Sequence, residues 1–420
     1  MTRLFVATFW MLACGVASGQ PADPPYTLTD LEARAAASHP ALAAAMAAAA
    51  RTRAESEQAG AWMNPTIGYT AEEVRPGGVI RGGEHGFFVE QVIPLGRKLH
   101  LQKSALLEQG HVADAELSAA RARVRARVQS AFAGVLAADQ RLDARTRLAS
   151  LLEEGVGVAQ QLYNVGIADR PDLLEAEAEA ARATLAVTRA RFSREAAWAD
   201  LAAAVGDPAL PARPLSGSLQ ALPVLAGRDR VRSDVMTTHP DLVAARARVG
   251  QAEAELGRAK RQTSPDLVVR GGLLYNRELF ERSSAGDARE VGWEGSAEVG
   301  VTVPLWNRNK GGTTAATAGV DVARAGVRVV EQALETRFTR AWMSREDALA
   351  SVEAYRDAIL PRAEEAYRLY LARYKEMAAA YPQVLVARRG LLEATTDYID
   401  ALEQAWRQTV QLQSLLGEDD

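Results

Sequence analysis

The chain has 420 residues, of which 48% are hydrophobic and 24% charged, enough for a packed core in one large domain or two ordinary ones. Its net charge is −4 and it contains no long Lys/Arg block, which argues against nucleic acid as the principal partner. Arginines recur along helical segments such as ARARVRARV (120–128). We interpret them as a solvated face beside an apolar stripe.

The N-terminal stretch MTRLFVATFWMLACGVASGQ has the layout of a secretory signal peptide, with one Arg, an apolar run and then small residues. We predict a signal peptide over residues 1–19, whose removal also removes Cys14, the single cysteine, and leaves no disulfide. An alternative treats MLAC (11–14) as a lipobox, with Cys14 lipidated as the new N-terminus. After this segment no apolar run reaches about 18 residues, so the sequence predicts no transmembrane helix.

The rest of the chain is an internal duplication. SHPALAAA (38–45) and THPDLVAA (238–245) share a His-Pro step, and the next prolines, Pro65 and Pro265, keep the same offset. We therefore expect a first repeat over 20–206, a linker over 207–230 that forms a belt, and a second repeat over 231–420.

Helices dominate both repeats. The helix that follows residue 97 contains no proline and has an apolar stripe through Val124, Val128, Phe132 and Val135. At about 1.5 Å per residue it is on the order of 100 Å long, far beyond an ordinary globular helix. The predicted helices cover about 27–62, 97–162, 172–206, 231–262, 312–374 and 383–415.

Four runs with a period of two predict strands. Each is about ten residues long and has one apolar and one polar face, as a tilted strand that crosses a bilayer requires. Four strands cannot close a barrel, and open edges are not tolerated in lipid, so the barrel must be shared among subunits. Alternation alone also allows two hairpins packed on a soluble core. The predicted strands are about 64–73, 86–95, 265–275 and 295–305.

The polar faces of these strands supply the candidates for a channel lining. Gln91 is the exception to the alternation, because it falls on the apolar face of the second run. We expect the following residues to face the lumen: Thr66, Thr70, Glu90, Arg270, Glu298 and Thr302.

With these features the sequence resembles the TolC-like outer-membrane factors, the exit ducts of tripartite efflux pumps. The resemblance covers essentially the whole mature chain: two repeats, Asn64-Pro65 before the first strand, PLGRK (94–98) before the long helix, and YNVGIADRPDLLEA (163–176) as the family's tip motif. It implies a mostly α fold with a small transmembrane β part. In that fold a homotrimer forms one twelve-stranded β-barrel, four strands per chain, continued by a long periplasmic α-helical barrel.

The same resemblance suggests the residues of the periplasmic tip or gate. In the second half YKEMAAAYPQVLVA (374–387) keeps the tyrosine but has Gln383 where the motif has Asp, which puts an acidic ring from this repeat in doubt. Asp172 also has another interpretation, that it caps the return helix after Pro171. The candidates are Tyr163, Gly166, Asp172, Glu175, Tyr374 and Gln383.

The implied function is a passive duct in outer-membrane lipid with a large periplasmic part. Its partners would be a periplasmic adaptor, or membrane fusion protein, and an inner-membrane RND transporter. VEQVIPLGRK (89–98) looks most like the heavy-metal branch, so we expect metal cations as cargo. A duct for organic compounds and, further off, a soluble periplasmic coiled-coil adaptor are the alternatives. The chain has no catalytic motif, its five histidines show no i, i+4 pairing, and no cofactor or resident metal is expected.

Overall fold

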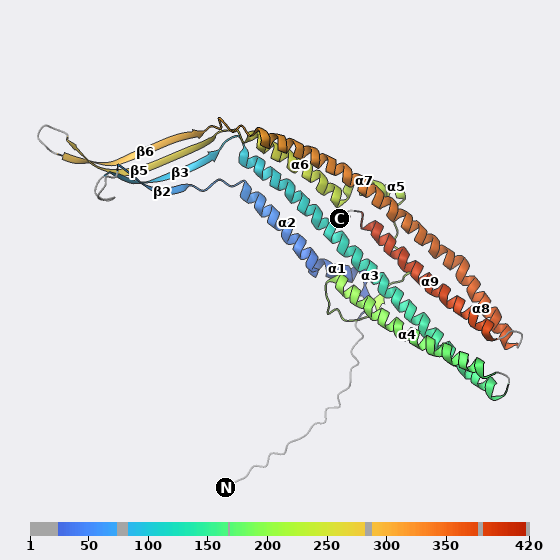
Figure 1. The fold of residues 1–420 in the computed structure, drawn as a ribbon. Helices are drawn as coiled ribbons and strands as arrows, with labels where there is room; N and C mark the ends of the chain where they lie inside the picture. Colours follow the sequence, from blue (N-terminus) through green and yellow to red (C-terminus); the bar gives the residue numbers. More distant parts are fainter. Residues whose placement is uncertain (1–23, 74–82, 167–168, 282–287, 377–380, 417–420) are drawn as a thin grey trace, which may run out of the picture.

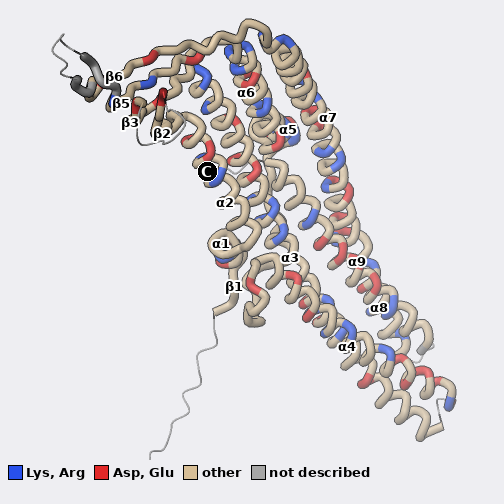
Figure 2. The backbone as a smooth tube through the Cα atoms, turned by 60° about the vertical axis from the view of Figure 1, so that its left-hand side comes forward, with Lys and Arg blue, Asp and Glu red and all other residues tan. Residues whose placement is uncertain are grey.

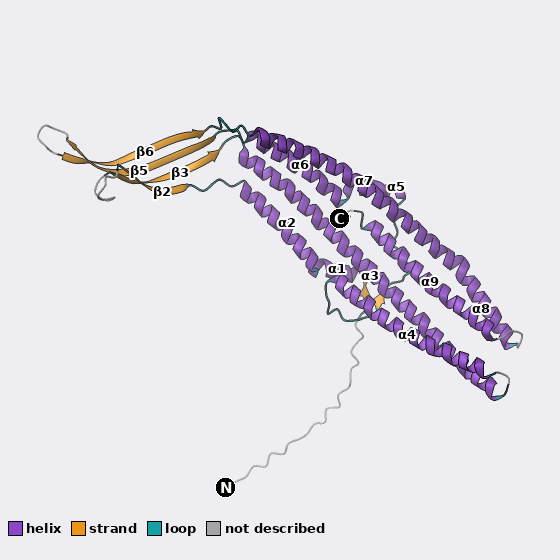
Figure 3. Ribbon diagram, in the orientation of Figure 1, coloured by secondary structure: helices purple, strands orange, loops and turns teal. Residues whose placement is uncertain are grey.

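The computed structural model describes residues 24–73, 83–166, 169–281, 288–376 and 381–416. The molecule is elongated: the long strands form a sheet at one end, and long helices run from there to the other end (Figure 1). Figure 3 shows this separation of strand and helix by colour. The predicted signal peptide and Cys14 lie outside the described residues.

The same order of elements occurs twice: a helix pair, two strands, a long helix and a return helix. The first set contains β1 (Tyr26–Thr27), α1 (Leu28–Ser38), α2 (Pro40–Ala59), β2 (Thr66–Glu72), β3 (Glu84–Pro94), α3 (Lys98–Asn164) and α4 (Arg170–Val205). The second set contains β4 (Leu215–Ser216), α5 (Arg228–Thr238), α6 (Pro240–Arg261), β5 (Asp266–Glu281), β6 (Ala288–Thr302), α7 (Lys310–Ala354), the π-helical turn η1 (Tyr355–Ile359), α8 (Leu360–Lys375) and α9 (Tyr381–Gln413).

A His-Pro step divides the first helix of each half, where the sequence pattern predicted one continuous helix. Proline has no amide hydrogen and fits only the first turn of a helix, so a new helix begins at Pro40 and at Pro240. The histidine caps it: Nδ1 of His39 and of His239 accepts a hydrogen bond from the backbone N–H two residues later, at 3.1 and 3.0 Å. The repeated dipeptide is therefore a break and a cap in one.

The two long helices differ. α3 is unbroken over 67 residues, on the order of 100 Å at 1.5 Å per residue. Its counterpart, predicted as one helix over 312–374, contains the π turn Tyr355–Ile359 between α7 and α8. Pro361, the second residue after this turn, cannot donate to the helical ladder, so the widened turn accommodates the proline without ending the helix.

The helices lie side by side as a wall. α2 and α4 pack along successive stretches of α3, and α3 in turn contacts α6 and α9 of the second half. The largest buried cluster lies halfway along, where the belt crosses α3, α4 and α9; the belt ends at residue 227, short of the predicted 230, because α5 begins at Arg228. Phe132, Leu201 and Leu402 are at most 2% exposed in this cluster. Trp406 Nε1 donates to the carbonyl of Leu219 in the belt at 2.8 Å. Within the described ranges, no helix combines the length and the apolar character that crossing a bilayer requires.

The sheet has the order β2-β3-β5-β6, with every neighbouring pair antiparallel and with β2 and β6 at the edges. β5 and β6 extend further from the helices than the predicted 265–275 and 295–305. Apolar alternation fades beyond Tyr275, but backbone pairing needs no apolar side chains and continues, with a register shift between Asn276 and Leu279.

Candidate functional site

One face of the sheet carries large apolar side chains that the chain leaves exposed. The register places Ile67 opposite Val89, and Val269 opposite Val299, so alternate residues of all four strands share this face. Ile67 is 73% exposed and Val299 69%. Such a continuous apolar surface marks a face made for an apolar environment or a partner. Its exposed large members are Ile67, Tyr69, Phe87, Val89, Val269, Leu273, Trp293, Val299 and Val301.

The opposite face carries the six strand residues predicted to line a channel. Thr66 lies opposite Glu90, Glu90 opposite Arg270, and Arg270 opposite Glu298, so one polar row crosses all four strands. Alternation places the remaining two, Thr70 and Thr302, on this same face. The structure thus brings the six residues together, and their position in a lumen stays a prediction.

Gln91, the exception on the apolar face, has a structural explanation. Its Nε2 donates to the carbonyl of Met63 at 2.9 Å and to that of Val92 at 3.0 Å. Residue 63 precedes β2, in a stretch whose carbonyls have no strand opposite them. The side-chain amide therefore satisfies backbone groups at the end of the sheet nearest the helices, where β3 continues past the start of β2.

Residues with left-handed backbone connect the strands to the long helices. Arg97 (φ 61°) precedes α3, and Asn309 (φ 47°) precedes α7. Next to the first, Lys98 Nζ lies 2.8 Å from Asp266 Oδ1, with only 16% and 31% of the two side chains exposed. Lys98, the last residue of PLGRK, thus links the start of α3 to the start of β5 through an ion pair.

At the far end of the wall, α3 and α4 form the first hairpin tip. Tyr163 is in the last turn of α3, and Gly166 has φ +76°, the left-handed conformation that ends many helices. Asp172 and Glu175 are exposed in the first two turns of α4. Asp172 does not cap this helix: the N-cap position belongs to Asp169, two residues before the proline, so the capping interpretation is wrong.

The second hairpin tip, between α8 and α9, lies near the first. Tyr374, in the last turn of α8, has its pKa raised by burial and, after that, by the negative charge of Asp172. Asp172 and Tyr374 therefore lie within electrostatic range of each other, whereas Gln383 is exposed near the start of α9. We expect Tyr374 to stay protonated and able to donate a hydrogen bond at every physiological pH.

Sequence reasoning missed an ion pair that joins the two hairpins. Arg389 of α9 pairs with Glu179 of α4, whose side chain is only 11% exposed, and Arg182 holds the same carboxylate at 2.6 Å. No local pattern marks Glu179, because its partner lies 210 positions away. The pair shows that α4 and α9 meet on the approach to the tips.

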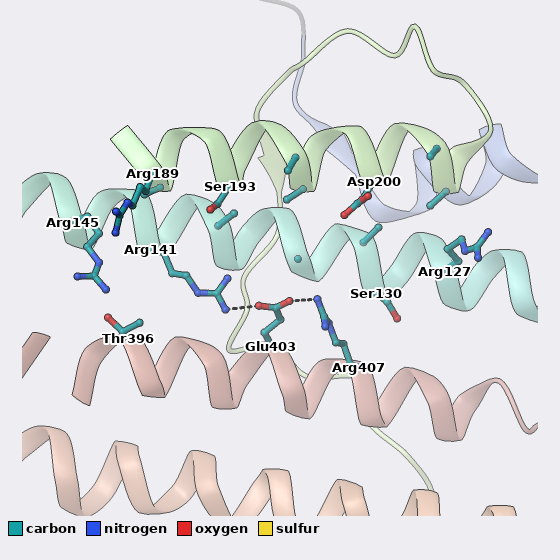
Figure 4. A pocket seen from close by; sticks show the side chains of 18 of the residues that line it. Arg127, Ser130, Arg141, Arg145, Arg189, Ser193, Asp200, Thr396, Glu403 and Arg407 are labelled. Atoms are coloured by element: carbon teal, nitrogen blue, oxygen red, sulfur yellow. Dashed lines mark hydrogen bonds and ion pairs between the residues drawn. The ribbon is translucent and has the colours of Figure 1, made fainter. Parts of the chain in front are cut away.

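A groove of about 920 Å³ lies over α3, between α4 and α9 (Figure 4). In it Arg141 Nη2 lies 2.5 Å from both Asp400 Oδ1 and Glu403 Oε2, and Arg407 contacts the same glutamate. Only 10% of the Glu403 side chain is exposed. These ion pairs join α3 to α9. The charged side chains that line the groove are Arg127, Arg141, Arg145, Arg189, Arg407, Asp200 and Glu403.

Comparison with protein families decides the class of the molecule. The model of the family described as "Outer membrane efflux protein" matches residues 31–207 and 231–418, most of the chain. The chain belongs to this family. Both matched stretches consist of the helix–strand–strand–helix series described above.

Individual relatives of this efflux protein are more distant. The cobalt-zinc-cadmium resistance protein CzcC of Cupriavidus metallidurans is 25% identical over 325 residues, 77% of this chain and 75% of that protein. The structure of the outer membrane protein VceC from Vibrio cholerae has a TM-score of 0.74 at 20% identity and covers 93% of this chain and 96% of its own. The open state of the MtrE outer membrane channel of Neisseria gonorrhoeae gives 0.73 at 21%, covering 93% and 88%.

The predicted TolC-like fold, a long helical part with a small β part, is confirmed by these similarities. As a member of the family, the chain is an outer membrane efflux protein and not an enzyme. Figure 2 shows Lys/Arg and Asp/Glu interspersed along the long helices.

Proposed function

We propose that this efflux protein forms a homotrimeric exit duct in the outer membrane. Three copies contribute four strands each to one barrel, and their helices form a tunnel through the periplasm. A periplasmic adaptor and an inner-membrane RND transporter deliver the cargo, heavy-metal cations, to the tip. The observation that carries this proposal is the sheet, which is apolar and exposed on one face, polar on the other, and open at both edges.

The dimensions of the apolar face suit an outer membrane. From Leu267 to Tyr275 the strand rises roughly 27 Å, close to the apolar band of about 25 Å in such barrels. Trp62 and Trp306 are 67% and 93% exposed at the helix end of the sheet, and Trp293, opposite Tyr275, is 73% exposed at the other limit of the apolar band. Aromatic residues at both limits are typical of the two membrane interfaces.

The open edges indicate how the copies associate. Among the described residues, β2 and β6 each have one side without a strand partner, and lipid offers no hydrogen bonds for those backbone groups. Pairing β6 of one copy with β2 of the next repeats the same contact around a closed ring. The two edges of the helical wall also carry exposed apolar residues. Phe192 of α4 and Val322 of α7 are 65% and 72% exposed, as expected for surfaces that a neighbouring copy covers.

The metal cargo is supported by the named function of the CzcC relative and by the PLGRK turn. No group of three or more potential metal ligands occurs among the described residues, so the duct would conduct ions without a resident site there. An organic-compound duct of the same fold is the alternative that the cargo experiment in the Discussion addresses.

The tip residues are proposed to set the resting state. Asp172 and Tyr374 lie where the two hairpins approach each other, so their separation would accompany opening. Tyr163, Gly166, Glu175 and Gln383 surround this point on the same two hairpin ends. They are the expected contact region for the adaptor.

Cell fractionation with heat-dependent gel mobility tests the assembly directly. We expect the protein in the outer membrane, migrating at three times the monomer mass until heated. Recovery of an unassembled monomer from the periplasm would reject both the barrel and the duct.

A further inference from the structure

The groove over α3 contains more arginines than there are carboxylates to pair with them. Five arginines and two carboxylates line it, and Asp400 beside it pairs with Arg141, which leaves an excess of two positive charges. Arg141 and Arg407 are paired with acids. In contrast, Arg127, Arg145 and Arg189 form no ion pair or hydrogen bond with any other residue in the described part of the chain. Three guanidinium groups in one groove are thus available to a ligand.

These arginines lie on the face of the wall that the belt leaves open. The belt packs against Phe132 and Leu136 of α3, next to Gly217. On the same helix the groove is lined by residues 127, 131, 134, 138, 141 and 145, whose spacing of four and three places them on one stripe. At 100° per residue this stripe is centred on the side of the helix opposite Phe132 and Leu136.

We propose that this groove faces the lumen of the periplasmic tunnel and binds anionic groups, namely phosphate, carboxylate or sulfonate, on passing solutes. The lumen placement rests on the proposed function. A tunnel built from these walls stays clear only if the belt runs around its outside, which leaves the groove on the inside.

The chemistry of the groove fits oxyanions. A guanidinium presents a planar fork of N–H donors that matches two oxygens of such a group. Figure 4 shows Arg145 of α3 and Arg189 of α4 at the same end of the groove, so donors from two helices converge there. The volume of about 920 Å³ exceeds that of a small polyanion, and rings of arginine are used by pores that favour anions.

The groove also bears on the proposed cargo. Repeated in three copies, it surrounds the tunnel with positive charge that repels free divalent cations at this level. Metal ions would therefore pass it more readily when they are complexed by anionic ligands.

Binding of inorganic pyrophosphate to the detergent-purified assembly, measured by calorimetry at low salt, tests the site. We expect R145Q/R189Q to weaken binding at least about ten-fold. The matched control is R147Q/R191Q: it changes the same charge on the same two helices, at exposed positions on the side away from the groove. R145K/R189K should bind with intermediate affinity. Equal binding by the wild type and R145Q/R189Q, or equal loss in the control, would refute the site.

The reversal potential of single channels in a planar bilayer under a KCl gradient tests the lumen placement. R145Q/R189Q should shift the reversal potential toward cation selectivity, and R147Q/R191Q should not. Conducting channels with no shift would place the groove outside the tunnel while leaving the duct intact. Absence of conductance both in this protein and in the Asp172→Asn/Tyr374→Phe variant with the loosened tip would reject the duct instead, and pyrophosphate binding would still decide whether the groove holds anions.

Discussion

At the scale of single residues, polar side chains form hydrogen bonds with backbone N–H and C=O groups that the ends of helices and strands leave without partners. Gln91 donates hydrogen bonds to backbone carbonyls at the end of the sheet, and His39 and His239 cap the helices that begin at the two prolines. His239 is only 4% exposed, and burial lowers its pKa below the ordinary value of 6.5, although the nearby Asp241 opposes this and Arg337 adds to it. The cap requires the neutral ring, because Nδ1 must accept a hydrogen bond.

This cap makes stability depend on pH. Because the folded-state pKa of His239 is depressed, its contribution is complete above about 6.5 and is lost as the pH falls through the lowered folded-state value. His239→Ala should lower the free energy of unfolding by about 1–3 kcal/mol. His239→Asn, whose side-chain oxygen accepts the same bond without titrating, should retain most of the stability. Apparent unfolding temperatures in detergent from pH 8 to about 5 check this, and identical profiles for wild type and His239→Asn would contradict it.

The tip offers a second prediction at this scale. Asp172→Asn with Tyr374→Phe removes the carboxylate and the hydroxyl where the two hairpins approach each other and should shift a closed-to-open equilibrium toward open, by no more than roughly ten-fold. Single-channel conductance measures the change. Glu177→Gln, an exposed charge on the same helix, is the control. If the Asp172→Asn/Tyr374→Phe variant conducts no more than the wild type and the Glu177→Gln control, Asp172 and Tyr374 are not part of the gate.

At the scale of elements, the environment of a strand residue is set by the face of the sheet that it occupies, whereas the environment of a helix residue is set by the neighbouring helices. A strand residue changes its environment completely from one position to the next. In α3, by contrast, one stripe contacts the belt and the opposite stripe lines the groove, so a single helix serves two surfaces.

A pair of adjacent substitutions in β6 tests the assignment of the faces. Val301 is 54% exposed on the apolar face, and Thr302 follows it on the polar face. Val301 pairs with Leu267 near the limit of the apolar band, so Val301→Lys should cost up to about 1 kcal/mol and reduce the amount of assembled trimer, whereas Thr302→Lys should assemble normally. The amount of heat-modifiable trimer measures both. Equal assembly of the two variants would count against a membrane-facing surface.

At the scale of the whole molecule, a single chain exposes surfaces that assembly with other copies would cover. Sheet edges, exposed apolar helix edges and a charged groove all remain on the monomer. Three copies in a ring would cover the first two and enclose the third.

The cargo belongs to this scale. Deleting the gene should sensitise cells to zinc, cadmium, cobalt or copper if the duct serves metal efflux, and restoring it should reverse the effect. A panel of dyes and antibiotics, tested in parallel, provides the comparison. Sensitivity confined to organic compounds would replace the metal assignment with the alternative.

The sequence by itself determined the periodic features, because they depend on residues close in the chain. Stripes in α3, alternation around Val301 and the repeated His-Pro step were all visible there, and they predicted the helices, the strands and the two faces. Only the tertiary structure decided which distant segments meet. The approach of Asp172 to Tyr374, the pairing of Glu179 with Arg389 and the joint groove of α3, α4 and α9 depend on contacts between helices far apart in sequence. Local patterns cannot specify them, because the same amphipathic helix can pack against many partners.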